Sequence, residues 1–234
     1  MKPLKKKYKS IFFDADDTLF DYPRAERAAL LACHHEFQVP IEPEIFITTY
    51  RRHNHDVWRE FEQGDIDQAT LRVERFHRLA AELSIPGLLL EKISIYYLEA
   101  LAGQSQLLPG ALATVQALAE EYPLALVTNG IASVQNKRFA ASSITPYFQA
   151  IVISEEVGVA KPDPRIFRPA LDKLGVEAVD VLYVGDSVTS DMAAARNAGM
   201  DFCWLNPAGV PVPAGQAPAF IIASIKELPG CRGL

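Results

Sequence analysis

Short apolar runs recur along the chain and predict the strands of a parallel sheet. They lie at 10–13, 124–127, 150–153, 181–184 and 202–205, and Phe220-Ile221-Ile222 predicts a further edge strand. Helical patterns separate the later runs, at 112–121, 134–141, 165–174 and 191–198, and Gly199 closes the last of them. Because buried strands that alternate with helices form parallel sheets, this pattern predicts a doubly wound, Rossmann-like α/β core.

The segment between the first two strands has a different pattern. From 24 to about 101, apolar residues recur at helical spacing, for example at Leu71, Phe76, Leu79 and Leu83. The breaks at Pro40, Pro43, Gly64, Pro86 and Gly87 predict about four helices. A crossover between parallel strands usually needs only one helix, so we interpret this block as an inserted helical domain. The predicted division is residues 1–20 and 104–234 for the core and 21–103 for the insert.

Composition narrows the class of protein. The chain has 234 residues and a formal net charge of -6, which argues against a nucleic-acid polymer as partner. The lysine-rich start, residues 2–9, indicates a solvated arm. No apolar run is long enough to span a bilayer, so we expect no membrane partner. Three widely spaced cysteines give no disulfide framework and suit a reducing cytoplasm, where we place the protein.

An acidic stretch, Asp14-Ala15-Asp16-Asp17-Thr18, follows the first strand. Like charges this close repel, so either a divalent cation compensates Asp14 and Asp16 or the stretch is an acidic turn. The ends of other strands decide between these interpretations. Ligands of open α/β sheets bind beyond the carboxyl ends of the strands. The side chains expected at that edge are Thr128, Asn129, Lys161 and Asp186, and together they favour the metal site.

These groups suit phosphoryl transfer from a monoester. Mg²⁺ held by carboxylates neutralises an approaching phosphate, and a lysine and a hydroxyl bind its remaining oxygens. One carboxylate can attack phosphorus and form an aspartyl-phosphate. A second carboxyl group can protonate the leaving alcohol and later accept a proton from water. Asp14 and Asp16 are two positions apart on an extended strand end, so both can face one phosphate.

At this point the sequence resembles the haloacid dehalogenase-like hydrolases. Four motifs carry the resemblance: Asp14-x-Asp16-x-Thr18-Leu19, Thr128 after a strand, Lys161 before Pro162-Asp163-Pro164, and Gly185-Asp186 followed by Asp191. The resemblance implies that Asp14 is the nucleophile and a Mg²⁺ ligand. It implies that Asp16 is the general acid/base and gives the metal its backbone carbonyl. Thr128 and Lys161 would bind phosphate with Asn129 beside them, and Asp186 would be the second metal carboxylate.

Three neighbouring polar residues have alternative roles. Asp191 reaches the metal through water, orients Lys161, or caps the helix that begins at Met192. Ser187 is either a first-turn hydroxyl or a group close to the metal. Asp17 is expected to be a turn residue.

The inserted helices resemble the family's small helical cap, which would close over the site. Within the cap, the segments 54–58 and 61–64 resemble pyrimidine nucleotidases, as does the ending 201–207. Asn54 and Trp58 are the candidates for contact with a base. The alternative for Trp58 is a place in the cap core. Trp204 and Cys33 are expected to be packed.

The function predicted is therefore a Mg²⁺-dependent phosphatase for a small phosphomonoester, above all a nucleoside 5'-monophosphate. Phosphoglycolate or a sugar phosphate is the alternative substrate. A phosphomutase is a less favoured alternative. A haloacid dehalogenase is also less favoured, because Asp16 and Asp186 have no use in dehalogenation. We expect a monomer or a homodimer.

Overall fold

The computed structural model describes residues 8–85, 90–231 and 234, and it contains one parallel sheet of six strands. The strand order is β3-β2-β1-β4-β5-β6. The strands are β1 (Ser10–Phe13), β2 (Leu124–Thr128), β3 (Ala150–Ile153), β4 (Val181–Gly185), β5 (Asp201–Leu205) and β6 (Phe220–Ile222). Each strand predicted from an apolar run is present, and the predicted doubly wound α/β fold is confirmed.

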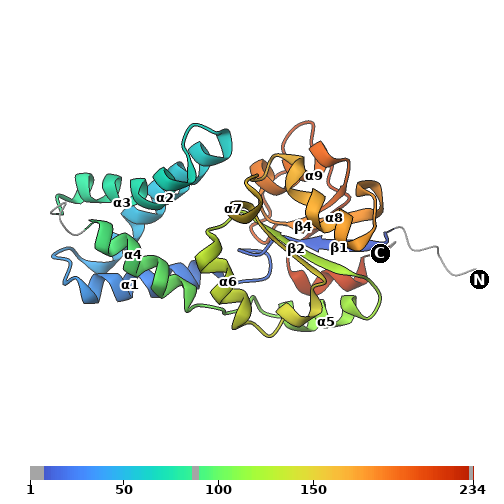
Figure 1. The fold of residues 1–234 in the computed structure, drawn as a ribbon, viewed down its shortest axis with the longest axis horizontal. Helices are drawn as coiled ribbons and strands as arrows, with labels where there is room; N and C mark the ends of the chain where they lie inside the picture. Colours follow the sequence, from blue (N-terminus) through green and yellow to red (C-terminus); the bar gives the residue numbers. More distant parts are fainter. Residues whose placement is uncertain (1–7, 86–89, 232–233) are drawn as a thin grey trace, which may run out of the picture.

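Helices cover both faces of the sheet (Figure 1). The alternation along β1 shows why: Ile11 and Phe13 pack in one apolar cluster with α5, whereas Phe12 packs in another with α8 and α9. The helices of the core are α5 (Ala111–Ala119), α6 (Ala132–Ala140), α7 (Ser154–Val157), α8 (Arg168–Leu174) and α9 (Ala193–Ala198). As predicted, Gly199 ends α9, in the left-handed conformation with φ 74°.

In the described part of the segment between β1 and α5, four helices lie to one side of the sheet (Figure 1). They are α1 (Tyr22–Glu36), α2 (Pro43–Gln63), α3 (Gln68–Leu83) and α4 (Leu90–Ala102). The side chain of Asp21 accepts a hydrogen bond from the Arg24 amide and so caps α1, while Asp67 caps α3 in the same way. Their apolar cluster includes Ile131 and Val134, so the helical block packs on the start of α6.

Two features that the sequence analysis used lie outside the described residues. Pro86 and Gly87, expected to separate two helices, lie outside them, as does the lysine-rich start before Tyr8.

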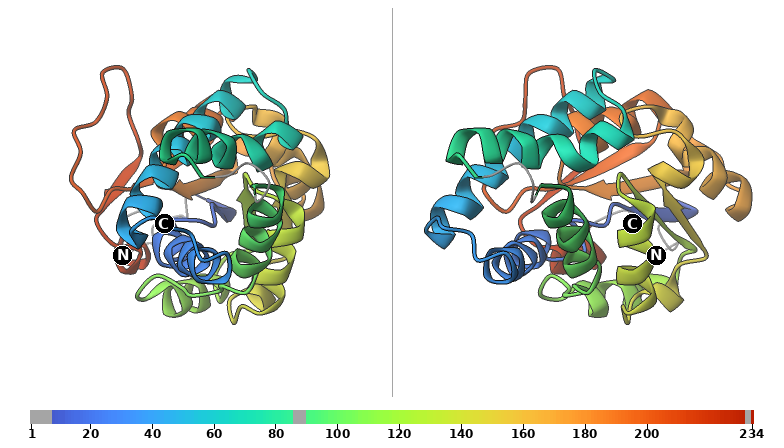
Figure 2. Two further views of the ribbon diagram at one scale, coloured as in Figure 1. Left: turned by 90° about the vertical axis from the view of Figure 1, so that its left-hand side faces the viewer. Right: turned by 60° about the vertical axis from the view of Figure 1, so that its left-hand side comes forward.

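The segment 206–219 between β5 and β6 forms a long loop that stands away from the body (Figure 2). Within the described ranges, every helix is too short or too polar to span a bilayer.

Candidate active site

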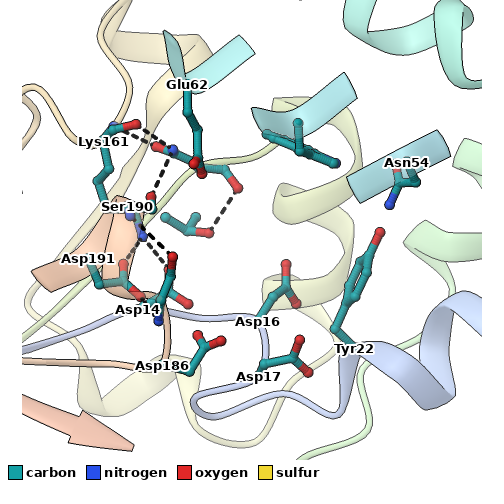
Figure 3. Close-up of a pocket in the computed structure, with 14 residues that line it drawn as sticks. Asp14, Asp16, Asp17, Tyr22, Asn54, Glu62, Lys161, Asp186, Ser190 and Asp191 are labelled. Carbon is teal, nitrogen blue, oxygen red and sulfur yellow. Dashed lines mark hydrogen bonds and ion pairs between the residues drawn. The ribbon is translucent and has the colours of Figure 1, made fainter. Parts of the chain in front are cut away.

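Three carboxylates meet at the carboxyl edge of the sheet, where the strand order reverses. Asp14 follows β1, Asp186 follows β4, and Asp191 lies in the single helical turn η5 (Val188–Met192). One oxygen of each lies within 4.8 Å of the others (Figure 3). The Asp14 amide donates to the Val184 carbonyl at 2.9 Å, so pairing of β1 with β4 fixes this arrangement.

Lys161 lies within this acidic cluster, and its side chain is only 2% exposed. Its ammonium lies 2.5 Å from Asp14 Oδ1 and 2.7 Å from Asp191 Oδ1. Burial lowers the pKa of Lys161, but the charges of Asp14 and Asp191 outweigh it and raise that pKa well above its ordinary value. The lysine is therefore charged, and it is oriented by two carboxylates.

One ammonium does not neutralise three carboxylates, of which Asp14 and Asp191 are buried and Asp186 is partly buried. Burial raises the pKa of Asp14 well above its usual range, and the charges of Asp191 and Asp186 add to this. Burial and the Asp191 charge raise the pKa of Asp186 to about 8. Such a cluster is short of positive charge, and its ligands are all oxygens, the type that hard divalent cations prefer. The residues present therefore fit a divalent metal ion.

The carboxylate of Asp16 lies apart from this cluster and is held by α6. Arg138 Nη1 lies 2.7 Å from Asp16 Oδ1, and Gln135 Nε2 donates to Asp16 Oδ2 at 2.9 Å. Arg138 Nη1 also donates to Gln135 Oε1, so the two partners of Asp16 orient each other. The sequence prediction missed both residues. The available signal was their spacing of three positions on a helix that follows the second strand, which puts them on one face.

The two polar residues after β2 have different surroundings. Thr128 lines a cavity above the three carboxylates, which is described below. Its hydroxyl accepts a long hydrogen bond of 3.4 Å from Gln135 Nε2. The Asn129 side chain is bonded to both backbone groups of Lys161: its Nδ2 donates to the Lys161 carbonyl and its Oδ1 accepts from the Lys161 amide. Asn129 therefore positions Lys161 through its backbone.

The alternatives for the turn after β4 are now distinguishable. Ser187 Oγ accepts from the Ser190 amide, so Ser187 is the cap of η5. Asp191 is not a cap: its Oδ1 binds Lys161 and its Oδ2 accepts from the Ser187 amide. The orientation of Lys161 is thus the role that the contacts of Asp191 support.

Two aromatic side chains near this turn, Tyr183 and Trp204, make hydrogen bonds that the sequence did not predict. Tyr183 is fully buried, and its hydroxyl lies 3.0 Å from both Lys161 Nζ and Asp191 Oδ1. Trp204 is packed, as expected, but its indole NH also donates to the Asp186 carbonyl at 2.8 Å. Asp17 has a φ of 61°, consistent with the predicted turn.

A cavity of about 230 Å³ lies between the acidic cluster and the inserted helices, in which we predicted the cap. Trp58 of α2 lines the cavity. Asn54 and Glu62 of the same helix line it as well (Figure 3). Trp58 packs edge-on against Phe61, with ring centroids 5.7 Å apart, so it belongs to both the cap and the cavity wall. Asn54 is buried and bonded to Glu26 and Arg75 within the cap.

Comparisons with known proteins agree with this arrangement. The family model for haloacid dehalogenase-like hydrolase matches residues 8–199. The chain is 35% identical over 224 residues to the pyrimidine 5'-nucleotidase YjjG of Escherichia coli, covering 95% of this chain and 96% of that protein. It is 31% identical over 229 residues to the pyrimidine 5'-nucleotidase PynA of Streptococcus pneumoniae, covering 96% and 94%.

A solved structure is similar over the same length. The HAD-hydrolase YfnB of Bacillus subtilis, crystallised with bound magnesium, superposes with a TM-score of 0.87 at 30% identity, covering 94% of this chain and 96% of YfnB. The chain therefore belongs to the haloacid dehalogenase-like hydrolases. The family predicted from the four motifs is confirmed, as is the prediction of an enzyme of the hydrolase class. The resemblance to the pyrimidine nucleotidase branch is likewise confirmed, since two of these relatives carry that name.

Proposed function

We propose that this protein is a Mg²⁺-dependent phosphatase that hydrolyses pyrimidine nucleoside 5'-monophosphates. One observation carries the proposal: a buried lysine and three carboxylates form the floor of a cavity that an aromatic cap residue, Trp58, helps to close. The names of YjjG and PynA support the choice of substrate class.

The proposed chemistry begins at Asp14. Its carboxylate attacks phosphorus while the Lys161 ammonium, 2.5 Å from its Oδ1, remains beside the attacked phosphate and balances its charge. Asp14, Asp186 and Asp191 are the residues that would hold or surround Mg²⁺. When bound, the metal supplies the positive charge that lets two anions approach each other.

We assign proton transfer to Asp16. Arg138 and Gln135 hold its carboxyl group at the cavity wall, on the side from which the cap covers the site. From there it protonates the leaving 5'-oxygen and then takes a proton from the water that hydrolyses the aspartyl-phosphate. Thr128 is placed to donate its hydroxyl to a phosphate oxygen.

The cap, residues 21–103, is proposed to exclude water and to receive the leaving nucleoside. Glu62 of the cap and Ser190 of the core both line the cavity, so its wall is built from both parts. Dehalogenation is the weaker alternative on the same fold, since it gives no task to Asp16 or Asp186.

A panel of phosphomonoesters tests the proposal. Phosphate release should be measured with Mg²⁺ for pyrimidine and purine monophosphates, ribose 5-phosphate and phosphoglycolate, and repeated with a chelator. We expect kcat/KM for pyrimidine monophosphates to exceed that for the others by at least about tenfold, and the chelator to abolish turnover. A preference for phosphoglycolate or a sugar phosphate would refute the nucleotidase assignment and leave the phosphatase chemistry standing.

A further inference from the structure

A second cavity of about 40 Å³ lies under the cap beside the active-site cavity. The two share Asp16, Tyr22, Trp58 and Asn129 as wall residues, so the smaller one continues the larger. We call it the cap slot. Apolar side chains of α4 and α6 line it, as do two arginines: Leu98, Leu101, Ile131, Val134, Arg75 and Arg138. A leaving group that extends from a phosphate at Asp14 past Asp16 and Trp58 enters this slot.

Arg75 of α3 is the unusual residue of the slot. It is 1% exposed, and its guanidinium carbon lies 5.2 Å, 5.7 Å and 6.0 Å from the ring centroids of Tyr97, Phe76 and Tyr50. Its Nη1 donates to Asn54 Oδ1 at 3.0 Å. Its Nε and Nη2 have no hydrogen-bond partner, and it forms no ion pair with any carboxylate that the structure describes.

The three rings stabilise the charge of Arg75, but they do not replace hydrogen bonds to its two unpaired donors, and unpaired buried donors cost free energy. Arg138, on the opposite wall, is also 1% exposed, and its Nη2 likewise lacks a partner among the described residues. A guanidinium group only donates hydrogen bonds. The ligand of the slot must therefore present acceptors.

Asn54, a candidate from the sequence, lines the active-site cavity and not the slot. Its oxygen accepts from Arg75, and its nitrogen donates to Glu26 Oε1 at 3.3 Å. Arg51 Nε in turn binds Glu26 Oε2 at 2.7 Å. This chain of contacts positions the Arg75 guanidinium. Arg75 lines the slot, and two of its nitrogens make no hydrogen bond with the described residues.

We infer that the cap slot binds a carbonyl-bearing edge of a neutral, planar leaving group, with Arg75 as the donor that determines specificity. The inference rests on the proposed function, for which the carbonyl belongs to a pyrimidine ring. The slot has room for roughly three water-sized atoms, enough for one edge of such a ring. Asp16 is also a wall residue of the slot, and its charge would repel a carboxylate, which favours an uncharged group.

The first test changes the substrate and leaves the protein intact. Uridine 5'-monophosphate is compared with the 5'-phosphate of the difluorotoluene ribonucleoside, whose ring has a similar shape but lacks the carbonyl oxygens. We expect kcat/KM to be roughly 10- to 100-fold lower for the analogue, the range for a lost hydrogen bond to a charged donor. Equal values for the two compounds would overturn the inference while leaving the nucleotidase assignment intact. If no nucleoside monophosphate is hydrolysed at all, the proposed function itself fails.

The second test is Arg75→Met, with Arg51→Met as the matched control. Arg51 belongs to the same network but does not line the slot. We expect Arg75→Met to lower kcat/KM for uridine 5'-monophosphate at least about tenfold more than for ribose 5-phosphate, which has no base. Arg51→Met should leave the ratio between these substrates unchanged. Equal loss on both substrates in Arg75→Met, or a greater loss on phosphoglycolate, would contradict the inference. If Arg75→Met does not fold, the substrate comparison on the unchanged protein decides.

Discussion

The Lys161 ammonium lies 2.5 Å from Asp14 Oδ1, although the two residues are 147 positions apart in the chain. This contact joins the proposed nucleophile to the cation that would balance the attacked phosphate. Asp191 completes the arrangement at 2.7 Å from the same nitrogen. The site therefore depends on one buried ammonium group that contacts two carboxylates at once.

Lys161→Met should lower kcat/KM by at least about 100-fold, because no other lysine or arginine among the described residues lines the active-site cavity. Without metal, the variant should also lose on the order of 3–5 kcal/mol of stability, since buried carboxylates lose their partner. Added Mg²⁺ should then raise its melting temperature more than that of the unchanged protein. The control is Lys9→Met, which removes an exposed ion pair with Asp180 and should cost at most about 1 kcal/mol. An equal Mg²⁺ response in both variants would contradict the charge argument.

Tyr183→Phe removes only the hydroxyl that lies 3.0 Å from both Lys161 Nζ and Asp191 Oδ1. We expect kcat to fall about three- to tenfold with KM nearly unchanged, and stability to change by about 1 kcal/mol. Steady-state kinetics and thermal melts measure these effects. Tyr147→Phe, at a partly buried tyrosine bonded to Gln116 and outside the site, should alter neither constant. An unchanged kcat in Tyr183→Phe would show that the hydroxyl has no positioning role.

Gly185→Ala tests the packing of Asp191 against the end of β4. An added Cβ would lie 2.5 Å from Asp191 Oδ2, so the carboxylate would have to move. We expect a cost of about 1–3 kcal/mol and a loss of activity of at least about tenfold. The control is Gly103→Ala, where the nearest atom lies 3.4 Å away and no displacement is needed. Full activity in Gly185→Ala would show that the position of Asp191 does not matter for turnover.

Trp58→Ala should harm turnover of a nucleotide more than turnover of phenyl phosphate. The indole lines the cavity and its smaller continuation, so it is placed to contact a base and not the phosphate. We expect a difference of about five- to fiftyfold between the two substrates, the range for lost base stacking. Comparable losses on both substrates would show that Trp58 has only a packing role in the cap.

Much of the site could be predicted from the sequence because its main residues follow strand ends. Asp14, Asp186 and Lys161 come from segments whose position is fixed by the order of a parallel sheet, which short apolar runs reveal. The partners of these residues could not be predicted in that way. Arg75 has an ordinary polar place in a helical pattern, and only the packing of three aromatic rings around it shows that it is buried.

Tyr183 illustrates the same limit within a strand. Its apolar neighbours predict burial correctly, but whether its hydroxyl meets a polar group depends on the direction of the side chain. Asp191 was ambiguous for a related reason. Helix caps and lysine partners use the same carboxylate chemistry, so only the contacts with Lys161 and the Ser187 amide distinguish them.

The most direct test of the account is phosphate release from uridine 5'-monophosphate by Asp14→Asn in the presence of Mg²⁺. The substitution keeps the size of the side chain but removes the attacking carboxylate. We expect a loss of at least about 10³-fold in kcat, with a circular dichroism spectrum like that of the unchanged protein. Metal-dependent phosphate release within about tenfold of the unchanged protein would contradict the assignment of Asp14 as the nucleophile.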